Sequence, residues 1–447
     1  MFALPSCLQR FGLGLLALAA CPQQLPAHFL FIHLVRGPLP RIELHFAESA
    51  WDLSVNQQMI EILAGARAWR PGGEALTCES RPFGLVAPLA PQQDAACAAL
   101  TFGLLDRGEP FLLEYYAKGI GHLTAGATAS GLAAEILAEP IADAEGRLRL
   151  TILFNGRPAP GAEVVVPTAG TFTDTVTADG DGRVEIDAPA TPVFALRAMI
   201  REERQGEHEG QSFNLVKHYT TLTVHDLARA PADCDSLAWG LLMDARHCCA
   251  SNQPLDSHWR ANFDSIIGDE RVQGQVGGGA AGVTATPVGD AAAVAEQLQL
   301  LSWPPDPGTL DGEPVGFAEG RIAGDAVHIQ TANAQLHFTV ADRRLASVRR
   351  NNANGAEHLE VTDWKLTHED RLLPKQLALV SFDADQAILS VALFERRYTE
   401  LGDVQFIERQ HGTMIRSSAP IVEASIRFTD IETIVANPSS AAPRRSP

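Results

Sequence analysis

The first part of the chain alternates apolar and polar residues in the manner of β-strands. Residues 28–34 and 41–46 flank a Gly-Pro turn, which predicts a hairpin whose apolar residues share one face. The other elements predicted here are a short helix at 54–64, strands at 66–69, 100–106 and 111–117, and a loop at 119–131. We therefore expect residues 28–131 to form an N-terminal β domain.

Residues 132–226 contain short apolar strands at regular spacing, separated by turns rich in Gly, Pro and Asp. This regularity is typical of a small β-sandwich. The strands are predicted at 147–155, 162–166, 173–178, 184–186, 194–201 and 219–224.

A third region follows a boundary at residues 226–235, which contain two prolines. Helices are predicted at 236–250 and 291–303, and long alternating strands fill residues 316–431. This pattern indicates an α+β domain over 236–436 with one curved antiparallel sheet. The fold class is therefore mainly β, and the tail at 437–447 is expected to be disordered.

Residues 1–27 have the pattern of a signal peptide, since a single positive charge precedes an apolar run of about ten residues. Cleavage after Ala27 would make His28 the new N-terminus. A lipoprotein box that ends at Cys21 is the competing interpretation, and it would place a lipid on that cysteine. Either way the sequence predicts an exported protein of the periplasm or cell surface.

Charge narrows the classes of partner. The 447 residues carry a net charge of −19, and no basic patch is present, so a nucleic-acid partner is not expected.

No HExxH, GxSxG or P-loop pattern occurs, so nothing in the sequence favours an enzyme. No segment after residue 27 is apolar for long enough to be a transmembrane helix.

Cysteines and tryptophans leave alternatives open. Cys78 with Cys97, and Cys234 with Cys248 or Cys249, are possible disulfide pairs in an oxidising compartment. Four tryptophans of the C-terminal half are either core residues or the lining of a ligand cleft: Trp239, Trp259, Trp303 and Trp364.

Four segments occur in one order within residues 28–226: HFLFIH…LHFAES…AWR, DRGEPFLLEYYAKG, NGRPAPGAEVVV and GEHEG…VKHYTTLTV. Together they resemble a secreted bacterial domain-of-unknown-function family that is related to periplasmic nickel/cobalt-uptake accessory proteins. The second half of this region is similar to the transthyretin-like sandwich. The resemblance implies binding of nickel or cobalt.

Residues 237–432 resemble a second uncharacterised exported α+β family, which is found fused to the first in planctomycete-type proteins. The resemblance rests on LAWGLLMDAR, LPKQLALVSFDADQAILSVALF and ASIRFTDIE. Its sheet is similar in outline to the periplasmic lipoprotein-carrier folds, which is a likeness of fold only.

The predicted mature terminus is the main candidate site. The α-amine and imidazole of His28 could chelate one metal ion, and such nitrogen donors suit Cu(II) or Ni(II). The candidate partners are His218, and His208 with Glu207. The competing interpretation makes His218 a partly buried strand residue and His208 a solvated one. His33 lies five positions after His28, so the two face opposite sides of one strand and are not expected to share an ion.

The sequence thus predicts an exported protein that binds a Ni, Co or Cu ion through His28 and hands it to a partner such as a membrane transporter. The alternative is a periplasmic carrier or interaction module that holds a lipid or a protein segment on the curved C-terminal sheet.

Overall fold

The computed structural model describes residues 28–434 except for 54–56, 107, 143, 145, 168–172, 190, 192, 226–229, 250–257, 280–281, 289–313, 324–325, 368–371, 402–403 and 418–420. The predicted signal peptide at 1–27, helix at 291–303 and tail at 437–447 lie outside the described residues.

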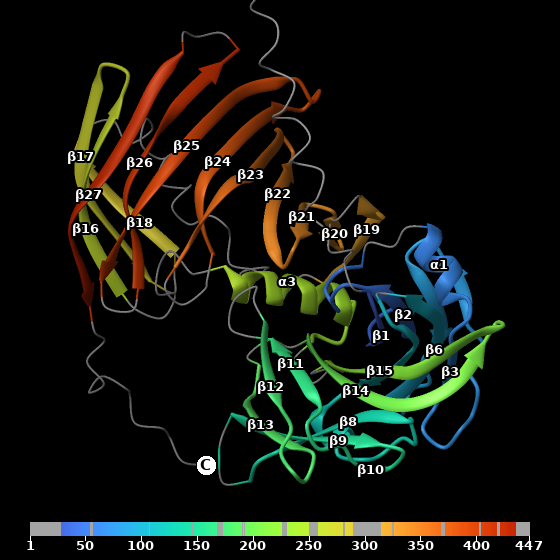
Figure 1. Cartoon of the computed structure of the whole chain (residues 1–447). Coiled ribbons are helices and arrows are strands. Elements are labelled where there is room, and N and C mark those ends of the chain that lie inside the picture. Colours follow the sequence, from blue (N-terminus) through green and yellow to red (C-terminus); the bar gives the residue numbers. More distant parts are fainter. Residues whose placement is uncertain are drawn as a thin grey trace, which may run out of the picture.

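The N-terminal part of the chain forms three sheets (Figure 1). Sheet A has the order β1 (Phe29–Val35), β2 (Arg41–Ala47), β5 (Gly84–Pro88), β4 (Glu79–Arg81). Sheet B has the order β12 (Thr173–Thr177), β11 (Glu163–Pro167), β14 (Val193–His208), β15 (Gln211–His225), β7 (Pro110–Ile120), β6 (Ala95–Asp106), β3 (Arg67–Trp69). Sheet C has the order β10 (Arg157–Pro158), β9 (Arg147–Phe154), β13 (Arg183–Asp187), and β8 (Ala134–Pro140) also pairs with β9. Two short helices accompany them, α1 (Gln57–Leu63) and α2 (Leu123–Gly126).

Sheet B lies between the other two sheets. Successive residues of a strand point to opposite faces, so β7 serves two cores. Tyr115 packs against Phe29 and Phe46 of sheet A, whereas Tyr116 faces His218 on the side of sheet C. The backbone of sheet B is therefore buried between two apolar layers.

The predicted boundary at residue 131 does not separate two sheets. β7 comes from the region before it and β15 from the region after it, yet the two strands pair in parallel from Phe111–Leu215 to Ile120–Val224. Residues 28–131 and 132–226 therefore share sheet B instead of forming two independent units.

The C-terminal part forms one antiparallel sheet of twelve strands, sheet D (Figure 1). Its order is β18 (Gly282–Val288), β17 (Glu270–Gly279), β16 (His258–Ile267), β27 (Val422–Ile434), β26 (Val404–Arg416), β25 (Ile388–Leu401), β24 (Leu372–Asp383), β23 (Gly355–Leu366), β22 (Arg344–Asn352), β21 (Leu336–Ala341), β20 (Ala326–Thr331), β19 (Val315–Ala323). The prediction of a mainly β fold with a large antiparallel sheet is confirmed.

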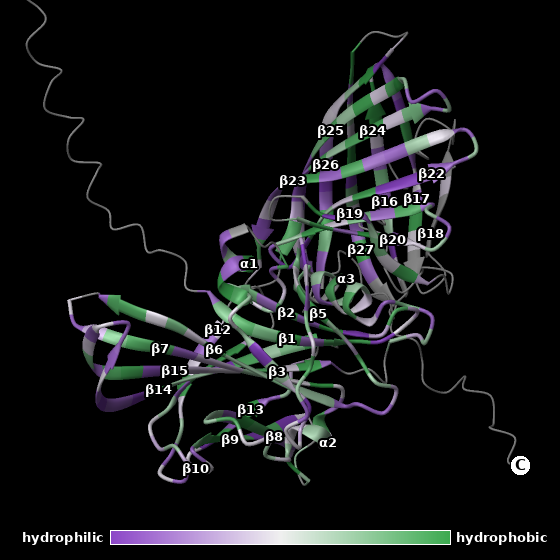
Figure 2. Cartoon of the chain, turned by 90° about the vertical axis from the view of Figure 1, so that its right-hand side faces the viewer, coloured by the Kyte–Doolittle hydropathy of each residue, from purple (hydrophilic) through white to green (hydrophobic). Residues whose placement is uncertain are grey.

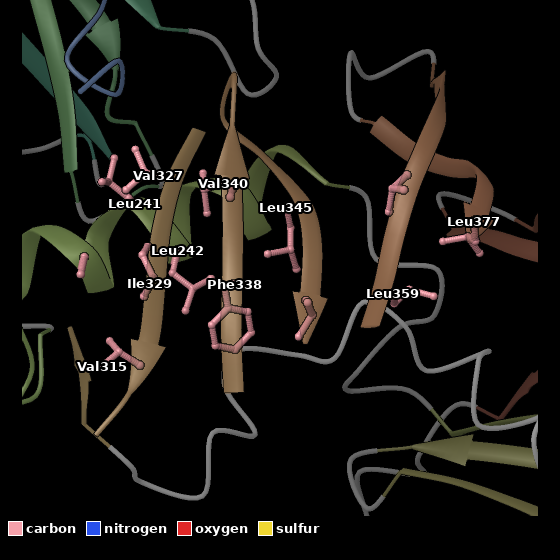
Figure 3. Packing of buried hydrophobic residues seen from close by; sticks show 14 of the residues in the cluster. Leu241, Leu242, Val315, Val327, Ile329, Phe338, Val340, Leu345, Leu359 and Leu377 are labelled. Atoms are coloured by element: carbon pink, nitrogen blue, oxygen red, sulfur yellow. The ribbon is translucent and has the colours of Figure 1, made fainter. Parts of the chain in front are cut away.

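Helix α3 (Ser236–Cys248) lies between sheet D and the N-terminal sheets (Figure 1). The Asp235 side chain caps its N-terminus by accepting hydrogen bonds from the backbone N–H groups of Leu237 and Ala238. Leu241 and Leu242 on the helix pack into the core of sheet D, where the buried residues include Phe338 (Figure 3). This core closes one end of the sheet.

The turn between β1 and β2 is fitted against the start of α3. Gly37 has a φ of 120°, and a Cβ atom there would lie 2.0 Å from the Cys234 carbonyl oxygen. The backbone N–H of Arg36 donates to the Ser236 hydroxyl, and the backbone N–H of Ser236 donates to the Arg36 carbonyl. Only glycine allows this close approach of the two chain segments.

Candidate functional site

His218, the predicted metal partner, lies on β15 and faces sheet C. Its Nε2 atom is 3.1 Å from a Glu202 carboxylate oxygen, and its Nδ1 atom is 3.4 Å from Oε2 of Glu114. Tyr116 donates a 2.5 Å hydrogen bond to that same Glu114 oxygen. The ring of Phe154 packs at 4.8 Å between centroids. The His218 side chain is only 3% exposed, so solvent reaches this group through its carboxylates.

The charged and polar side chains around His218 shift the pKa values of one another. The hydrogen bond from His218, stronger than the opposing effect of burial, lowers the pKa of Glu114 to about 2. Burial and the neighbouring Glu114 carboxylate raise the pKa of Tyr116 far above its usual value. Arg204 lies 3.4 Å from Glu202 and 3.7 Å from Glu114. Two carboxylates thus face the guanidinium of Arg204 and the two ring nitrogens of His218.

The contacts of His218 do not favour it as a metal ligand. A histidine binds a metal through a deprotonated ring nitrogen, and here each nitrogen faces a different carboxylate. The alternative interpretation of His218 as a largely buried strand residue fits these contacts better.

His28 lies on the other side of sheet B. Its ring stacks on Phe46 of sheet A at 5.9 Å between centroids, and Phe46 packs against Tyr115. Tyr115 and Glu114 are consecutive on β7 and so point to opposite faces. The structure therefore does not bring His28 together with His218.

His208 and Glu207 lie at the far end of β14, where His208 pairs with Gln211 in the hairpin with β15. Gln211 and His218 are seven positions apart on β15, a distance of roughly 23 Å along an extended strand. Among the residues that the structure describes, no three His, Cys, Asp or Glu side chains are placed to hold one metal ion. Metal binding by a free His28 amine remains a prediction, because residues 1–27 lie outside the described part.

A different group of histidines is buried in the N-terminal part. His33 on β1, His45 on β2 and His225 on β15 are each at most 1% exposed. His33 Nδ1 lies 3.0 Å from His225 Nε2, and the rings of His33 and His45 meet edge to face at 5.3 Å. His45 Nε2 lies 3.0 Å from Oε2 of the fully buried Glu43, which accepts bonds of 2.9 and 2.7 Å from Arg321. We call these five residues the histidine cluster.

The histidine cluster connects sheet A with sheet D, because Arg321 belongs to β19. The Arg321 guanidinium lies over the rings of Phe317 and Phe83, at 3.7 and 4.2 Å from their centroids. Arg41 bonds Glu43 at 2.5 Å and Asp235 at 2.8 Å, which extends the contact to the cap of α3. The cluster is therefore part of the joint between the two parts of the molecule.

Burial sets the protonation states in the cluster. It lowers the pKa of His33 well below its usual value, lowers that of His45, and lowers that of His225 to about 4. Burial alone would raise the pKa of Glu43, but the charge of Arg321 and hydrogen bonds from His45 and Arg321 hold it well below its usual value. The histidines are therefore neutral and Glu43 ionised at neutral pH.

The sequence predicts only part of this cluster. A hairpin is predicted here, and in its observed register His33 pairs with Glu43 and Phe31 with His45, which puts all three polar residues on one face. Nothing in the sequence indicated that His225 and Arg321 would meet them, since both come from distant strands.

Sheet D carries an exposed apolar surface on its outer face. Leu389 and Leu393 on β25, Ile415 at the end of β26 and Ile421 just before β27 are 46%, 54%, 45% and 67% exposed. We call these four side chains the aliphatic patch. Val391 pairs with Ile415 and lies two residues before Leu393 along β25, so Leu393 and Ile415 share one face of the sheet. Figure 2 shows hydrophobic positions, in green, along β24, β25 and β26.

The aliphatic patch lies at the end of sheet D that is remote from α3. Cys249, which caps α3, bridges to Leu372 at the first residue of β24, whereas the part of β25 that carries the patch pairs with the second half of β24, from Ala378 to Phe382. β24 has 12 residues and is therefore roughly 36 Å long. The patch is thus well separated from the joint.

The structure bears on the possible disulfides and on the role of the C-terminal tryptophans. No disulfide joins the five cysteines of the described region. Trp259 is a core residue of sheet D, and Trp239 and Trp364 pack against the core under α3. Trp303 lies outside the described residues.

Two cavities described by the structure both lie in the N-terminal part. One of about 680 Å³ lies between α1, β3 and β5, and its lining includes Trp69 and Cys78. The other, of about 460 Å³, is bordered by Lys118, whose ammonium group already donates to Glu135 and to the Thr128 carbonyl.

The chain matches no protein-family model and no curated protein. Among solved structures it is similar to a LolA superfamily protein from Nitrosomonas europaea, with 11% identity, 45% of this chain and 95% of that chain covered, and a TM-score of 0.20. It is also similar to a Ca²⁺-stabilized adhesin of an Antarctic bacterium that binds ice, with 11% identity, coverage of 89% and 97%, and a TM-score of 0.12. Both TM-scores are far below 0.5, so neither likeness supports a statement about this protein. None of the described helices has the length and apolar character needed to cross a membrane.

Proposed function

We propose that the protein is a binding protein whose C-terminal sheet docks reversibly on a neutral lipid surface through the aliphatic patch. The observation that carries this proposal is the exposure of four large aliphatic side chains on one face of β25, β26 and the start of β27. The largest apolar patch on a monomeric protein typically covers a few hundred Å² and is often functional.

The chemistry of the patch favours acyl chains over a protein partner. Protein-binding surfaces owe most of their affinity to Trp, Tyr and Arg, and the aliphatic patch contains none of these. β25 and β26 each have a hydrogen-bonded neighbour on both sides, so neither can add a strand from a peptide. The contact therefore rests on apolar burial alone.

The size of the patch argues against a stable dimer. Four aliphatic side chains that are about half exposed offer on the order of 200–400 Å² of apolar surface, whereas a stable protein interface needs about 800 Å² from each partner. A lipid surface accepts such a small set of side chains without further contacts.

The expected affinity is low. Inserting each half-exposed side chain contributes about 1 kcal/mol, so the four contribute about 4 kcal/mol, which corresponds to a Kd of about 1 mM in lipid. The net charge of −19 disfavours anionic membranes, so the surface that fits is zwitterionic. We therefore expect docking that forms and breaks readily.

Flotation with phosphatidylcholine vesicles at about 5 mM lipid tests this proposal, because that concentration exceeds the expected Kd. Wild-type protein should float with the vesicles. Leu393→Asp should bind at least about tenfold more weakly, because it removes an apolar contact and inserts a charge.

The matched control is Thr362→Asp, which adds the same charge at an exposed position on β23 outside the patch. This variant should float like wild type. Wild-type protein that stays unbound, or a Leu393→Asp variant that floats equally well, contradicts the proposal.

A further inference from the structure

The histidine cluster lies away from the aliphatic patch, at the contact between sheet A and sheet D. A change of charge on its histidines would act directly on that contact. We propose that it is an acid-operated latch, in which protonation of the three histidines opens the contact between sheet A and sheet D while the strands of both parts stay folded. This inference is independent of the proposed function.

Within the described part of the chain, the cluster offers no hydrogen-bond acceptor to an added proton. His33 and His225 bond to each other, which requires one of the two facing nitrogens to accept. The remaining nitrogens of the three rings, His33 Nε2, His45 Nδ1 and His225 Nδ1, are buried and have no hydrogen-bond partner among the residues that the structure describes. A protonated ring would therefore bury an unsatisfied charged N–H group.

The charged side chains around the three histidines are already paired with one another. Two cations, Arg41 and Arg321, face two carboxylates, Glu43 and Asp235, so the neutral cluster is balanced. The Asp52 carboxylate also acts on His45, from the segment after β2. Each further proton would leave a positive charge beside two guanidinium groups.

Repulsion between the protonated histidines and the guanidinium groups acts where the N-terminal sheets meet sheet D. Glu43 belongs to sheet A and Arg321 to sheet D, and a charged His45 would compete with Arg321 for the same Glu43 oxygen. Sheets A, B and C keep two cores of their own, and the strands around β16 and β27 keep another. Of the described residues, the core between α3 and sheet D would lose only Val35, Leu53 and Trp51, which come from the N-terminal part. Opening the joint therefore leaves most of each part packed.

The direction of the pH dependence follows from the low histidine pKa values in the closed form. A solvent-exposed histidine titrates near 6.5, whereas burial lowers the pKa of His225 to about 4. The open form therefore binds more protons between these values, and acid favours it. Closure is complete above about pH 6.5 and is lost as the pH falls toward 4.

Small-angle X-ray scattering and circular dichroism of the full chain between pH 7.5 and 4 test the latch. The radius of gyration should rise on acidification while the β-sheet signal is retained. An unchanged radius at pH 4 overturns the proposal, and so does a loss of the β-sheet signal together with expansion, since that is acid unfolding.

A variant that lacks two of the three titratable histidines provides the second test. The double substitution His33→Asn and His225→Asn should move the midpoint of opening down by at least about one pH unit. His122→Asn is the control, because His122 is a half-exposed residue beside Asp94, and it should leave the midpoint unchanged. A double variant that opens at the wild-type pH contradicts the latch.

If the double variant does not fold, the wild-type transition still decides the matter. The slope of the logarithm of the open-to-closed ratio against pH counts the protons taken up on opening. A latch with three histidines requires a slope of about two to three, and a slope of one or less overturns it.

Discussion

Replacement of Glu43 by glutamine is expected to lower the free energy of unfolding by about 3–5 kcal/mol. Glu43 is fully buried, and its carboxylate accepts bonds from Arg321, Arg41 and His45. Glutamine keeps the size of the side chain but removes the charge, so two largely buried guanidinium groups would lose their shared anion. Denaturant unfolding at pH 7.5 measures the change.

Glu79→Gln is the matched control for this substitution. Glu79 also pairs with an arginine, Arg81, but its side chain is 70% exposed. Water screens such a pair, and the expected loss is below about 1 kcal/mol. Equal losses for the two variants would show that burial of Glu43 does not determine the importance of its ion pair.

The second large effect is expected at Asp244 of α3. Asp244 is fully buried and forms two hydrogen bonds, of 2.8 and 2.9 Å, with Arg343. The Arg343 guanidinium also lies 4.1 Å from the ring centroid of Trp51, which comes from the N-terminal part. Asp244→Asn should lower the free energy of unfolding by about 3–5 kcal/mol, because it removes the buried carboxylate that pairs with the Arg343 guanidinium.

A double variant separates charge from packing at this position. Asp244→Leu combined with Arg343→Met replaces both charged groups with apolar ones of similar size, and such replacements of buried pairs are often neutral. Denaturant unfolding should therefore show that the double variant is more stable than Asp244→Asn. A double variant that is equally unstable would mean that the hydrogen bonds themselves stabilise the helix.

Local pattern predicted most of the strands in this protein. The alternation in residues 41–46 predicted a strand with Ile42, Leu44 and Phe46 on one face, and β2 has this arrangement. The same alternation suggests that Arg41, Glu43 and His45 face solvent, yet Glu43 and His45 are buried. Sheet D covers that face, and no pattern within a strand reports which distant strand will cover it.

The candidate metal site had the weakest basis in the sequence. A match between residue types and a ligand set says nothing about which face of a sheet each residue occupies. His28 and His218 lie on opposite sides of sheet B because β1 packs on one face and β9 on the other. The pairing of β15 with β7, about 100 residues earlier in the chain, decides this arrangement.

The exposure of the aliphatic patch could not be predicted from the sequence for a related reason. Leu389, Val391 and Leu393 alternate with Ser390 and Ala392, which predicts a strand with one apolar face turned inward. In the structure Ala392 is the buried residue and Leu393 the exposed one. The inner face is set by the neighbouring strands, where Ala392 pairs with Met414 and Leu379.

The most direct measurement of lipid docking is the depth of residue 393 in a bilayer. Leu393→Trp keeps the patch apolar, and its fluorescence can be compared with that of wild type, which contributes six native tryptophans. In phosphatidylcholine vesicles with brominated acyl chains, the added tryptophan should shift to shorter wavelength and be quenched, whereas Thr362→Trp should not. An emission from residue 393 that stays solvent-like and unquenched at millimolar lipid contradicts the account.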